Sequence, residues 1–281
     1  MINTKIEAIK NVAIIANLDK EGVLELMTQI VEYTSSKGLI VHKWPYRQNL
    51  HQENIQEVDF AFVLGGDGTV LYAANLFVGR STPILPINMG RIGFITEVRR
   101  DEWKEIFDLY LAGKAHFSHR LMLKVQLKRN GRLINTFFAL NEAVVGAAGI
   151  SKIVYLDVEL GGVTLGEYRA DGMLVATPTG STAYNLAAGG PILHPDVEAL
   201  ILTPICPHSL SNKPLVTSSE EIVTLYLKQK QRTTVMLTVD GRDVIPMEPG
   251  DEVVIQRLRK KARFLRSDLR SFYEVVRTKL N

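Results

Sequence analysis

The first hundred residues alternate between short apolar runs and segments of helical period. Asn11 to Ala16 predicts a strand, and apolar residues then recur at helical spacing from Val23 to Thr34 until Gly38, a typical helix C-cap. Leu39 to His42 predicts a second strand. The run VDFAFVL, from Val58 to Leu64, predicts a third strand that is apolar enough to be covered on both faces of a sheet. This alternation is typical of an α/β domain with a mostly parallel, Rossmann-like sheet.

The pattern changes near His116. Alternating runs such as Leu123 to Leu127 and Val235 to Val239 predict antiparallel strands. Between such runs lie pairs that favour hairpin turns, namely Asn130-Gly131, Asp171-Gly172 and Asp240-Gly241. The second half is therefore predicted to be all-β.

The C-terminal tail returns to helical spacing. A stripe of apolar residues follows Ser267 and Asp268, either of which can cap a helix, and consists of Leu269, Phe272, Tyr273, Val276 and Leu280. An amphipathic helix needs a surface to pack on, and we expect the first domain to provide it. The predicted domains are residues 1–115, with 262–281 packing back on them, and residues 116–261. The mainly helical stretch from Glu97 to Lys114 is expected to bridge them.

The amino-acid composition is that of a globular protein and gives no sign of a nucleic-acid or membrane partner. Hydrophobic residues make up 46% and charged residues 22% of the 281 residues, as in ordinary globular proteins. A net charge of +3 is too small to indicate a nucleic-acid or membrane partner. Cys206 is the only cysteine, so no intramolecular disulfide can form. With no predicted signal peptide or spanning segment, we expect a soluble cytoplasmic protein.

The segment Gly65-Gly66-Asp67-Gly68-Thr69 follows the third predicted strand and opens a helix. Glycines permit positive φ and close approach of the backbone, and a helix N-terminus favours anions, so the loop suits a phosphate. Asp67 is unexpected in such a loop, because a carboxylate repels phosphate. It fits if a metal neutralises it or if it accepts a proton from a hydroxyl nucleophile. A plain tight turn is the alternative, and neither a Walker A nor a GxGxxG motif occurs.

GGDGT after an apolar strand resembles the phosphate loop of NAD kinases, diacylglycerol and sphingosine kinases, and phosphofructokinases. Four further segments are similar to NAD kinases in particular, over roughly Asp59 to Asp240. They are Asn88-Met89-Gly90-Arg91-Ile92-Gly93-Phe94-Ile95-Thr96, Asn141-Glu142, Arg169-Ala170-Asp171-Gly172, and the run from Thr177 through Gly180-Ser181-Thr182-Ala183-Tyr184 to Gly189-Gly190-Pro191 and His194-Pro195.

The resemblance implies an ATP-dependent phosphotransferase that moves the γ-phosphoryl group of ATP to the 2′-hydroxyl of the adenosine ribose of NAD. It implies a sandwich-like β domain, the use of Mg²⁺ or another divalent metal, and a homodimer or homotetramer. The metal is expected at the ATP phosphates, and the alternative that protein carboxylates also hold it stays open. Asp67 would be the catalytic base, and Gly65, Gly66, Gly68 and Thr69 would bind phosphate. The NAD-binding residues would be Asp67, Gly68, Phe94, Asn141, Glu142, Asp171, Thr182, Ala183, Tyr184 and Asp240.

Several alternatives stay open. A lipid kinase also uses GGDGT, but its glycine-threonine-asparagine-aspartate turn is absent, as is the threonine-isoleucine-aspartate segment of phosphofructokinases. A non-catalytic NADP(H)-sensing module would gain nothing from Asp67 among phosphates. Ala187 stands where many NAD kinases have serine. The pair His116 and His119 lacks further metal ligands nearby, and the basic run from Arg257 to Arg266 is interpreted as a solvated edge.

Overall fold

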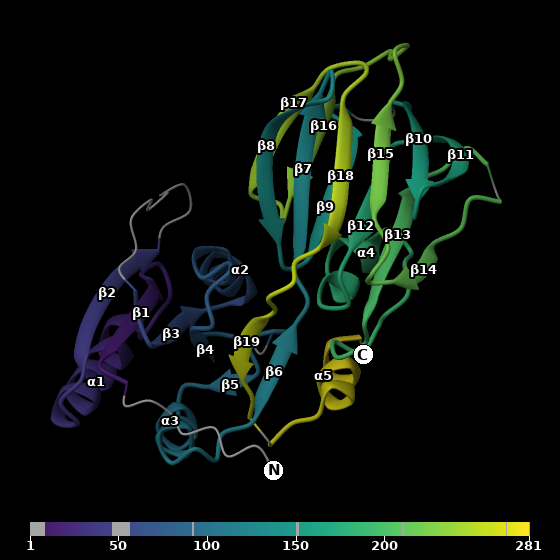
Figure 1. The fold of residues 1–281 in the computed structure, drawn as a ribbon. Coiled ribbons are helices and arrows are strands. Elements are labelled where there is room, and N and C mark those ends of the chain that lie inside the picture. Colours follow the sequence, from purple (N-terminus) through teal and green to yellow (C-terminus); the bar gives the residue numbers. More distant parts are fainter. Residues whose placement is uncertain are drawn as a thin grey trace. The chain divides into compact units, whose positions relative to one another are not determined.

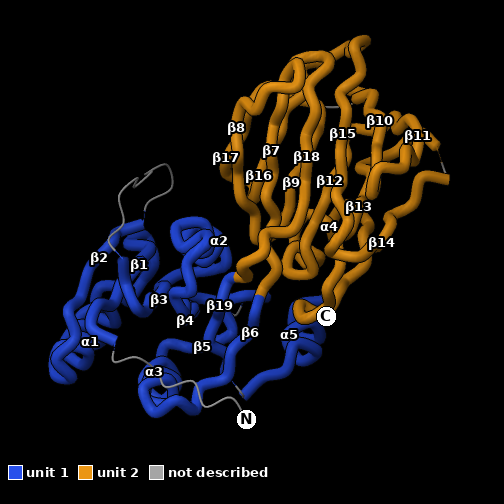
Figure 2. The backbone as a smooth tube through the Cα atoms, viewed as in Figure 1, with its two compact units in different colours: residues 1–119, 262–281 blue, residues 120–261 orange. Residues whose placement is uncertain are grey.

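The computed structural model describes residues 9–46, 57–91, 93–149, 152–209, 211–267 and 269–280 (Figure 1). The chain divides into two compact units, residues 1–119 with 262–281 (unit 1) and residues 120–261 (unit 2), coloured separately in Figure 2. The predicted change at His116 falls just before strand β6, and the division between the units falls within that strand. None of the helices in the described ranges is long and apolar enough to span a bilayer.

Unit 1 is an α/β domain built on a mostly parallel sheet, as predicted. Its described strands are β1 (Asn11–Asn17), β2 (Ile40–Tyr46), β3 (Phe60–Gly65), β4 (Pro83–Asn88), β5 (Val98–Arg99), β6 (Phe117–Arg120) and β19 (Ala262–Leu265), and its helices are α1 (Val23–Ser36), α2 (Asp67–Leu76), α3 (Trp103–Leu111) and α5 (Phe272–Leu280). The strand order is β2-β1-β3-β4-β19-β6, with β5 paired to β4. The pairs of β1 with β2, of β3 with β1 and β4, and of β19 with β4 are parallel.

Strand β3 occupies the centre of this sheet. All six of its residues, FAFVLG, are buried, and aromatic rings from α3 pack on Phe60 and Phe62. A strand that is apolar at every position has no face to offer to water, so it must lie between two helical layers. The central position predicted for the VDFAFVL run is confirmed.

The first helix begins and ends where the sequence predicts, but its buried face differs slightly from the predicted one. Gly38 adopts φ 78° just beyond the end of α1, and its N–H donates to the carbonyl of Ser35 at 2.9 Å. The buried face contains Leu26, whereas Leu24, which the helical pattern included, is 61% exposed.

The C-terminal helix differs more from its prediction. It starts at Phe272, and Ser271 caps it in a reciprocal pair with Glu274, in which each N–H donates to the other side chain. Ser267 is therefore not the cap, and Asp268 lies outside the described residues. Val275 is the buried residue of α5, whereas Leu269 and Tyr273 are 68% and 70% exposed, so the predicted stripe is not the packed face.

Unit 2 is a sandwich of two antiparallel sheets. One sheet has the order β11-β10-β15-β18-β7-β8 and the other β14-β13-β12-β9-β16-β17. The strands are β7 (Leu123–Arg129), β8 (Arg132–Ala139), β9 (Glu142–Ala147), β10 (Val154–Leu160), β11 (Val163–Ala170), β12 (Gly172–Ala176), β13 (Ala199–Ile205), β14 (Leu215–Ser218), β15 (Val223–Leu227), β16 (Val235–Val239), β17 (Asp243–Met247) and β18 (Glu252–Arg257). A 3₁₀ turn (Gly180–Thr182) and α4 (Tyr184–Ala187) follow β12. Alternate residues of both sheets form one apolar cluster, which confirms the all-β, sandwich-like prediction.

Two of the three predicted Asp/Asn-Gly turns form. Asn130 and Gly131 have φ 49° and 73° between β7 and β8, and Asp240 and Gly241 have φ 49° and 64° between β16 and β17. The prediction for Asp171-Gly172 is wrong, because β11 and β12 belong to different sheets and do not pair. Gly172 is needed there for close packing, since a Cβ would lie 2.7 Å from the carbonyl oxygen of Val145.

Candidate functional site

The GGDG loop lies at the carboxyl end of β3, beside the carboxyl end of β4. Gly65 is the register partner of Asn88, and the N–H of Met89 donates to the carbonyl of Gly65 at 3.0 Å. Ligands of open parallel sheets bind at this edge. The fold thus makes the Asp67 loop and the segment that starts at Asn88 neighbours.

The glycines of this loop act differently from the prediction. Gly65, Gly66 and Gly68 all lack a positive φ, so the expected left-handed backbone is absent from the loop. A Cβ on Gly65 would lie 2.2 Å from the hydroxyl oxygen of the buried Thr69, whereas Gly66 and Gly68 have nothing within 4 Å of that position. Because the first N–H groups of a helix have no intrahelical acceptor, Gly66 and Gly68 leave room for an anion at the start of α2.

Asp67 is the first residue of α2 and is half-buried. Its Oδ2 accepts the N–H of Phe94 at 3.0 Å, and its Oδ1 accepts the N–H groups of Ile95 at 3.3 Å and Thr96 at 3.0 Å. The hydroxyl of Thr96 also donates to Oδ1, at 2.9 Å. The structure therefore brings together two residues predicted for the site, Asp67 and Phe94. Ile92 lies outside the described residues.

Sequence reasoning assigned no individual role to two side chains in this network. Thr96 is fully buried, and Asn88 donates through Nδ2 to the hydroxyl of Thr96 at 2.9 Å and to the carbonyl of Arg91 at 2.8 Å. The Oδ1 of Asn88 accepts the N–H of Gly90 at 2.6 Å. The sequence offered one signal for a structural role of these two residues, namely their positions as the first and last residues of the Asn88–Thr96 motif.

In unit 2, Asp240 binds the backbone of the segment that carries Asn141 and Glu142. Its Oδ2 accepts the N–H of Leu140 at 2.8 Å, and its Oδ1 accepts those of Asn141 at 2.8 Å and Glu142 at 3.1 Å. Burial raises the pKa of Asp240 to about 6, although these three N–H groups and the charge of Arg242 limit the increase. Three of the residues predicted to bind NAD thus form one cluster.

The side chains of Asn141 and Glu142 each have an oxygen atom without a hydrogen-bond partner among the described residues. Both residues are less than 10% exposed, and within the described residues Asn141 Oδ1 and Glu142 Oε2 have no hydrogen-bond partner. Burial raises the pKa of Glu142 to about 8, and the nearby charge of Asp240 adds to this increase. Buried polar atoms without partners are unusual in a folded protein and indicate a place for a ligand that supplies donors.

The loop from Thr177 to Pro191 packs against this cluster and is held by its own buried side chains. The N–H of Thr177 donates to the carbonyl of Asn141 at 2.8 Å, and a Cβ on Gly180 would lie 2.2 Å from that same oxygen. The fully buried Asn185 donates to the carbonyls of Ser181 and Pro191, and it accepts the hydroxyl of Thr203 at 2.7 Å. Asn185 was missed at the sequence level because its side-chain partner, Thr203, lies on another segment.

The residues of this loop that were predicted to bind NAD are the outward ones. Thr182 and Ala183 are half-buried and Tyr184 is 45% exposed, whereas the fully buried Ser181 donates to the carbonyl of Pro178 at 2.6 Å. Ala187, at the end of α4, is exposed. The loop therefore leaves one side partly exposed and uses the other for folding.

A pocket of about 420 Å³ lies on the outer face of the β9-containing sheet. It is lined by Val144, Gly146, Ala147, Gly149, Asp171, Tyr184, Ile205, Met236, Thr238 and Val244. Glu142 is two residues before Val144 on β9, so strand alternation puts it on the same face. Asp171 and Tyr184 line one pocket whose other walls are mostly apolar.

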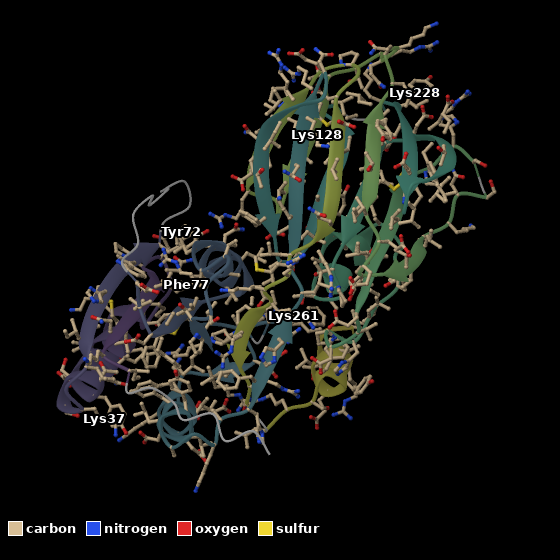
Figure 3. All side chains as sticks on the ribbon, in the orientation of Figure 1. Lys37, Tyr72, Phe77, Lys128, Lys228 and Lys261 are labelled. Atoms are coloured by element: carbon tan, nitrogen blue, oxygen red, sulfur yellow. The ribbon has the colours of Figure 1, made fainter. Side chains whose placement is uncertain are left out.

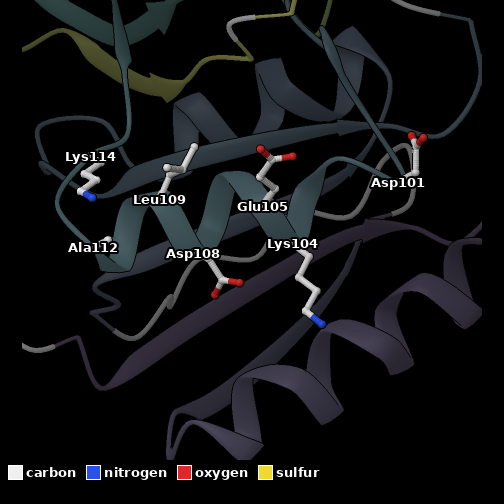
Figure 4. Close-up of a pocket in the computed structure, with 7 residues that line it drawn as sticks. All are labelled: Asp101, Lys104, Glu105, Asp108, Leu109, Ala112 and Lys114. Atoms are coloured by element: carbon white, nitrogen blue, oxygen red, sulfur yellow. The ribbon is translucent and has the colours of Figure 1, made fainter.

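Charged side chains outside these clusters form ion pairs of their own or line a separate hollow. In the basic run, Arg257 pairs with Glu220 at 2.6 Å and Lys261 (labelled in Figure 3) pairs with Glu198. A shallow hollow along α3 is lined by Asp101, Lys104, Glu105, Asp108, Leu109, Ala112 and Lys114 (Figure 4). It contains none of the predicted site residues. Across the described part of the chain, no three His, Cys, Asp or Glu side chains are grouped as a metal site.

Comparison with known proteins gives one consistent result. The family model for the ATP-NAD kinase N-terminal domain matches residues 45–115, and that for the ATP-NAD kinase C-terminal domain matches residues 140–267. The NAD kinase of Treponema denticola is 37% identical over 96% of each chain. The NAD kinase of Geobacter sulfurreducens is 38% identical over 96% of this chain and 98% of its own length.

Solved structures agree with the sequence relatives. Yeast NADH kinase, crystallised with NADH, superposes with a TM-score of 0.84 at 26% identity and covers 97% of this chain and 87% of its own. An NAD kinase from Archaeoglobus fulgidus, in complex with ATP, superposes with a TM-score of 0.75 at 25% identity, over 95% of this chain and 97% of its own.

Proposed function

The chain belongs to the NAD kinase family of ATP-dependent phosphotransferases, and we propose that Asp67 is the general base when it phosphorylates the adenosine 2′-hydroxyl of NAD. The observation that carries this proposal is a half-buried carboxylate in the first turn of α2, beside the open positions Gly66 and Gly68. Pure phosphate binding gains nothing from a negative charge there. A hydroxyl nucleophile does, because it must lose a proton during transfer.

The phosphate groups are assigned to the start of α2. The helix dipole and the N–H groups of its first turn attract negative charge, and a ligand can approach Gly66 and Gly68 without meeting a side chain. Gly65 and Thr69 belong to the same assignment, in which they shape the turn. ATP is the donor by family membership, and the Archaeoglobus relative was crystallised with it.

The ribose hydroxyls of NAD are assigned to Asn141 and Glu142. Their partnerless oxygens are acceptors that a pair of vicinal hydroxyl groups would satisfy. Asp240 belongs to this group as the residue that fixes their backbone. Thr182, Ala183, Tyr184 and Asp171 are assigned to the base ends of the dinucleotide, with Phe94 near the reacting ribose. The pocket that Tyr184 and Asp171 line supports this assignment.

A divalent cation, Mg²⁺ by preference, is assigned to the ATP phosphates. Octahedral Mg²⁺ commonly keeps several waters and binds through phosphates and one or two carboxylates. The donor set fits this mode, since one Glu142 carboxyl oxygen has no partner among the described residues and a bound cation would favour the ionised form of that group. When bound, the ion neutralises phosphate charge.

The exposed sheet edges and the single cysteine bear on oligomeric state and cellular location. The edge strands β8 and β14 carry exposed apolar side chains, including Leu133 and Val216, and such edges favour pairing with another copy. We therefore assign a homodimer or homotetramer. The single cysteine, Cys206, fits a reducing cytoplasm.

The test is NADP formation by the purified protein with ATP, Mg²⁺ and NAD, followed through a dehydrogenase that accepts only NADP. Asp67→Asn is expected to lower kcat by about 10²- to 10⁴-fold, the usual contribution of a general base, while binding of NAD persists. A wild type that binds NADP without making it would favour the sensing module instead. An Asp67→Asn variant with wild-type kcat would remove Asp67 from the chemistry but leave the activity standing.

A further inference from the structure

The hydrogen bond between Thr96 and Asp67 has a direction that chemistry fixes. The Nδ2 group of Asn88 can only donate, so at 2.9 Å the hydroxyl oxygen of Thr96 must accept from it. An ionised carboxylate can only accept, so the single hydroxyl hydrogen of Thr96 points to Oδ1 of Asp67. Asn88, Thr96 and Asp67 form a one-way chain in which the hydroxyl has no freedom to rotate.

The two carboxylate oxygens of Asp67 accept unequal numbers of hydrogen bonds. Oδ1 accepts three hydrogen bonds, from the N–H groups of Ile95 and Thr96 and from the hydroxyl of Thr96. Oδ2 accepts one, from the N–H of Phe94. Since a carboxylate oxygen has two lone pairs, Oδ1 is saturated and Oδ2 keeps one open.

We propose that Thr96, held by Asn88, is a positioning residue that anchors Oδ1 of Asp67 and leaves Oδ2 to take the proton of the NAD hydroxyl. The proposal rests on the function assigned to Asp67 above. It requires no new contact with either substrate. It makes the Asn88–Thr96 segment a support for the base, with both side chains buried beneath the loop.

The expected consequence concerns turnover rather than binding. Without the hydroxyl of Thr96, the carboxylate loses its one side-chain hydrogen bond among the described residues and is held only by the backbone N–H groups of residues 94–96, so Oδ1 can shift. A displacement of about 1 Å in a catalytic group can lower a rate by about 100-fold. Substrate affinity is expected to change little, because Oδ2 of Asp67 keeps its place at the NAD hydroxyl and the remaining phosphate and ribose contacts are assigned to other groups.

The test compares Thr96→Val, which keeps the shape and removes the hydroxyl, with Thr96→Ser, which keeps the hydroxyl. We expect Thr96→Val to lower kcat by about tenfold to 100-fold while KM for NAD and ATP changes by less than about twofold. Thr96→Ser is expected to recover most of the lost kcat. Thr34→Val is the matched control, because Thr34 is an equally buried threonine in α1 whose hydroxyl donates to the carbonyl of Ile30.

A double-mutant cycle separates positioning from folding. If Thr96 acts through Asp67, adding Thr96→Val to Asp67→Asn causes no further loss of kcat, since the base is already absent. An equal loss in both backgrounds, or a loss confined to thermal stability, would overturn the proposal. A wild-type rate in Asp67→Asn alone would instead refute the function assigned to Asp67, so the two failures are distinguishable.

Discussion

Glu142 and Asp240 are joined by two hydrogen bonds, which place two buried carboxyl groups in one cluster. The N–H of Asp240 donates to the carbonyl of Glu142 at 3.0 Å, and the N–H of Glu142 donates to the Asp240 carboxylate at 3.1 Å. The three N–H donors around Asp240 favour its ionised form. At neutral pH the pair therefore holds one charge, on Asp240, with Glu142 protonated.

The raised pKa of Glu142 makes folding stability pH-dependent. A group whose folded pKa lies above its unfolded value stabilises the fold fully below the unfolded value, and this contribution is lost as the pH rises through the folded pKa. For Glu142 the window runs from the ordinary value of 4.5 to about 8. Unfolding free energy is expected to fall by up to about 1.4 kcal/mol per pH unit from this group.

Glu142→Gln should remove this slope. Urea unfolding between pH 6.5 and 8, above the value of about 6 for Asp240, isolates the contribution of Glu142. We expect the variant to lose less stability than wild type across that range, and Glu21→Gln, at an exposed glutamate, to follow wild type. Parallel curves for wild type and Glu142→Gln would show that Glu142 is ionised throughout.

Asp240→Asn is expected to have the opposite effect on stability at pH 7. The amide offers one oxygen where three buried N–H groups now share two, so its NH₂ group must face at least one N–H donor. A buried donor left without an acceptor costs about 1–3 kcal/mol. The free energy of unfolding measured in urea should fall by that amount, and an unchanged value would mean that the Leu140–Glu142 backbone finds other acceptors.

The parts of the fold that the sequence predicted are those decided by neighbouring residues. The buried β3, the GGDG loop after it and the turns at Asn130 and Asp240 depend on local apolar pattern and on the turn preferences of glycine, asparagine and aspartate. The assignment of Asp171 and of Tyr184 to NAD binding came from the resemblance alone. Nothing in the composition of those segments places them in one pocket.

The rest depended on contacts between distant segments. Asp171-Gly172 has the composition of a hairpin turn, but the chain passes there from one sheet to the other, because β11 and β12 have different partners. Asn185 meets Thr203, and Asp240 meets Leu140 one hundred positions away. Periodicity also misplaced the packed face of α5, whose buried residue is Val275 rather than a member of the predicted stripe. Local pattern cannot decide which of several possible surfaces a tertiary fold covers.

Gly93 is predicted to be indispensable to the site. A Cβ there would lie 2.0 Å from Oδ1 of Asp67 and 2.5 Å from the Thr96 hydroxyl oxygen, whereas a Cβ on Gly90 meets nothing within 4 Å. Gly93→Ala must therefore displace Asp67, and we expect kcat to fall by about 100-fold or more. Gly90→Ala, in the same segment, is the control and should keep most of the activity. Equal kcat in the two variants would mean that the Asp67 network does not govern turnover.

Tyr184 tests the pocket of unit 2. It is 45% exposed at the edge of a mostly apolar lining, so its ring rather than its hydroxyl is expected to contact NAD. Losing one aromatic contact costs about 0.5–1.5 kcal/mol beyond the buried area, so Tyr184→Ala should raise the Kd for NAD by about tenfold. Tyr184→Phe, which keeps the ring, should bind within about twofold of wild type.

Isothermal titration of NAD into each Tyr184 variant gives the Kd directly, without the need for turnover. Tyr273→Ala is the control, because Tyr273 is a more exposed tyrosine on α5 and does not line the pocket. Equally weakened binding in Tyr184→Phe and Tyr184→Ala would reverse the argument, since the hydroxyl, which both variants lack, would then carry the contact. Unchanged affinity in both would place the dinucleotide outside this pocket, while leaving the Asn141–Glu142 cluster as a binding site to be tested on its own.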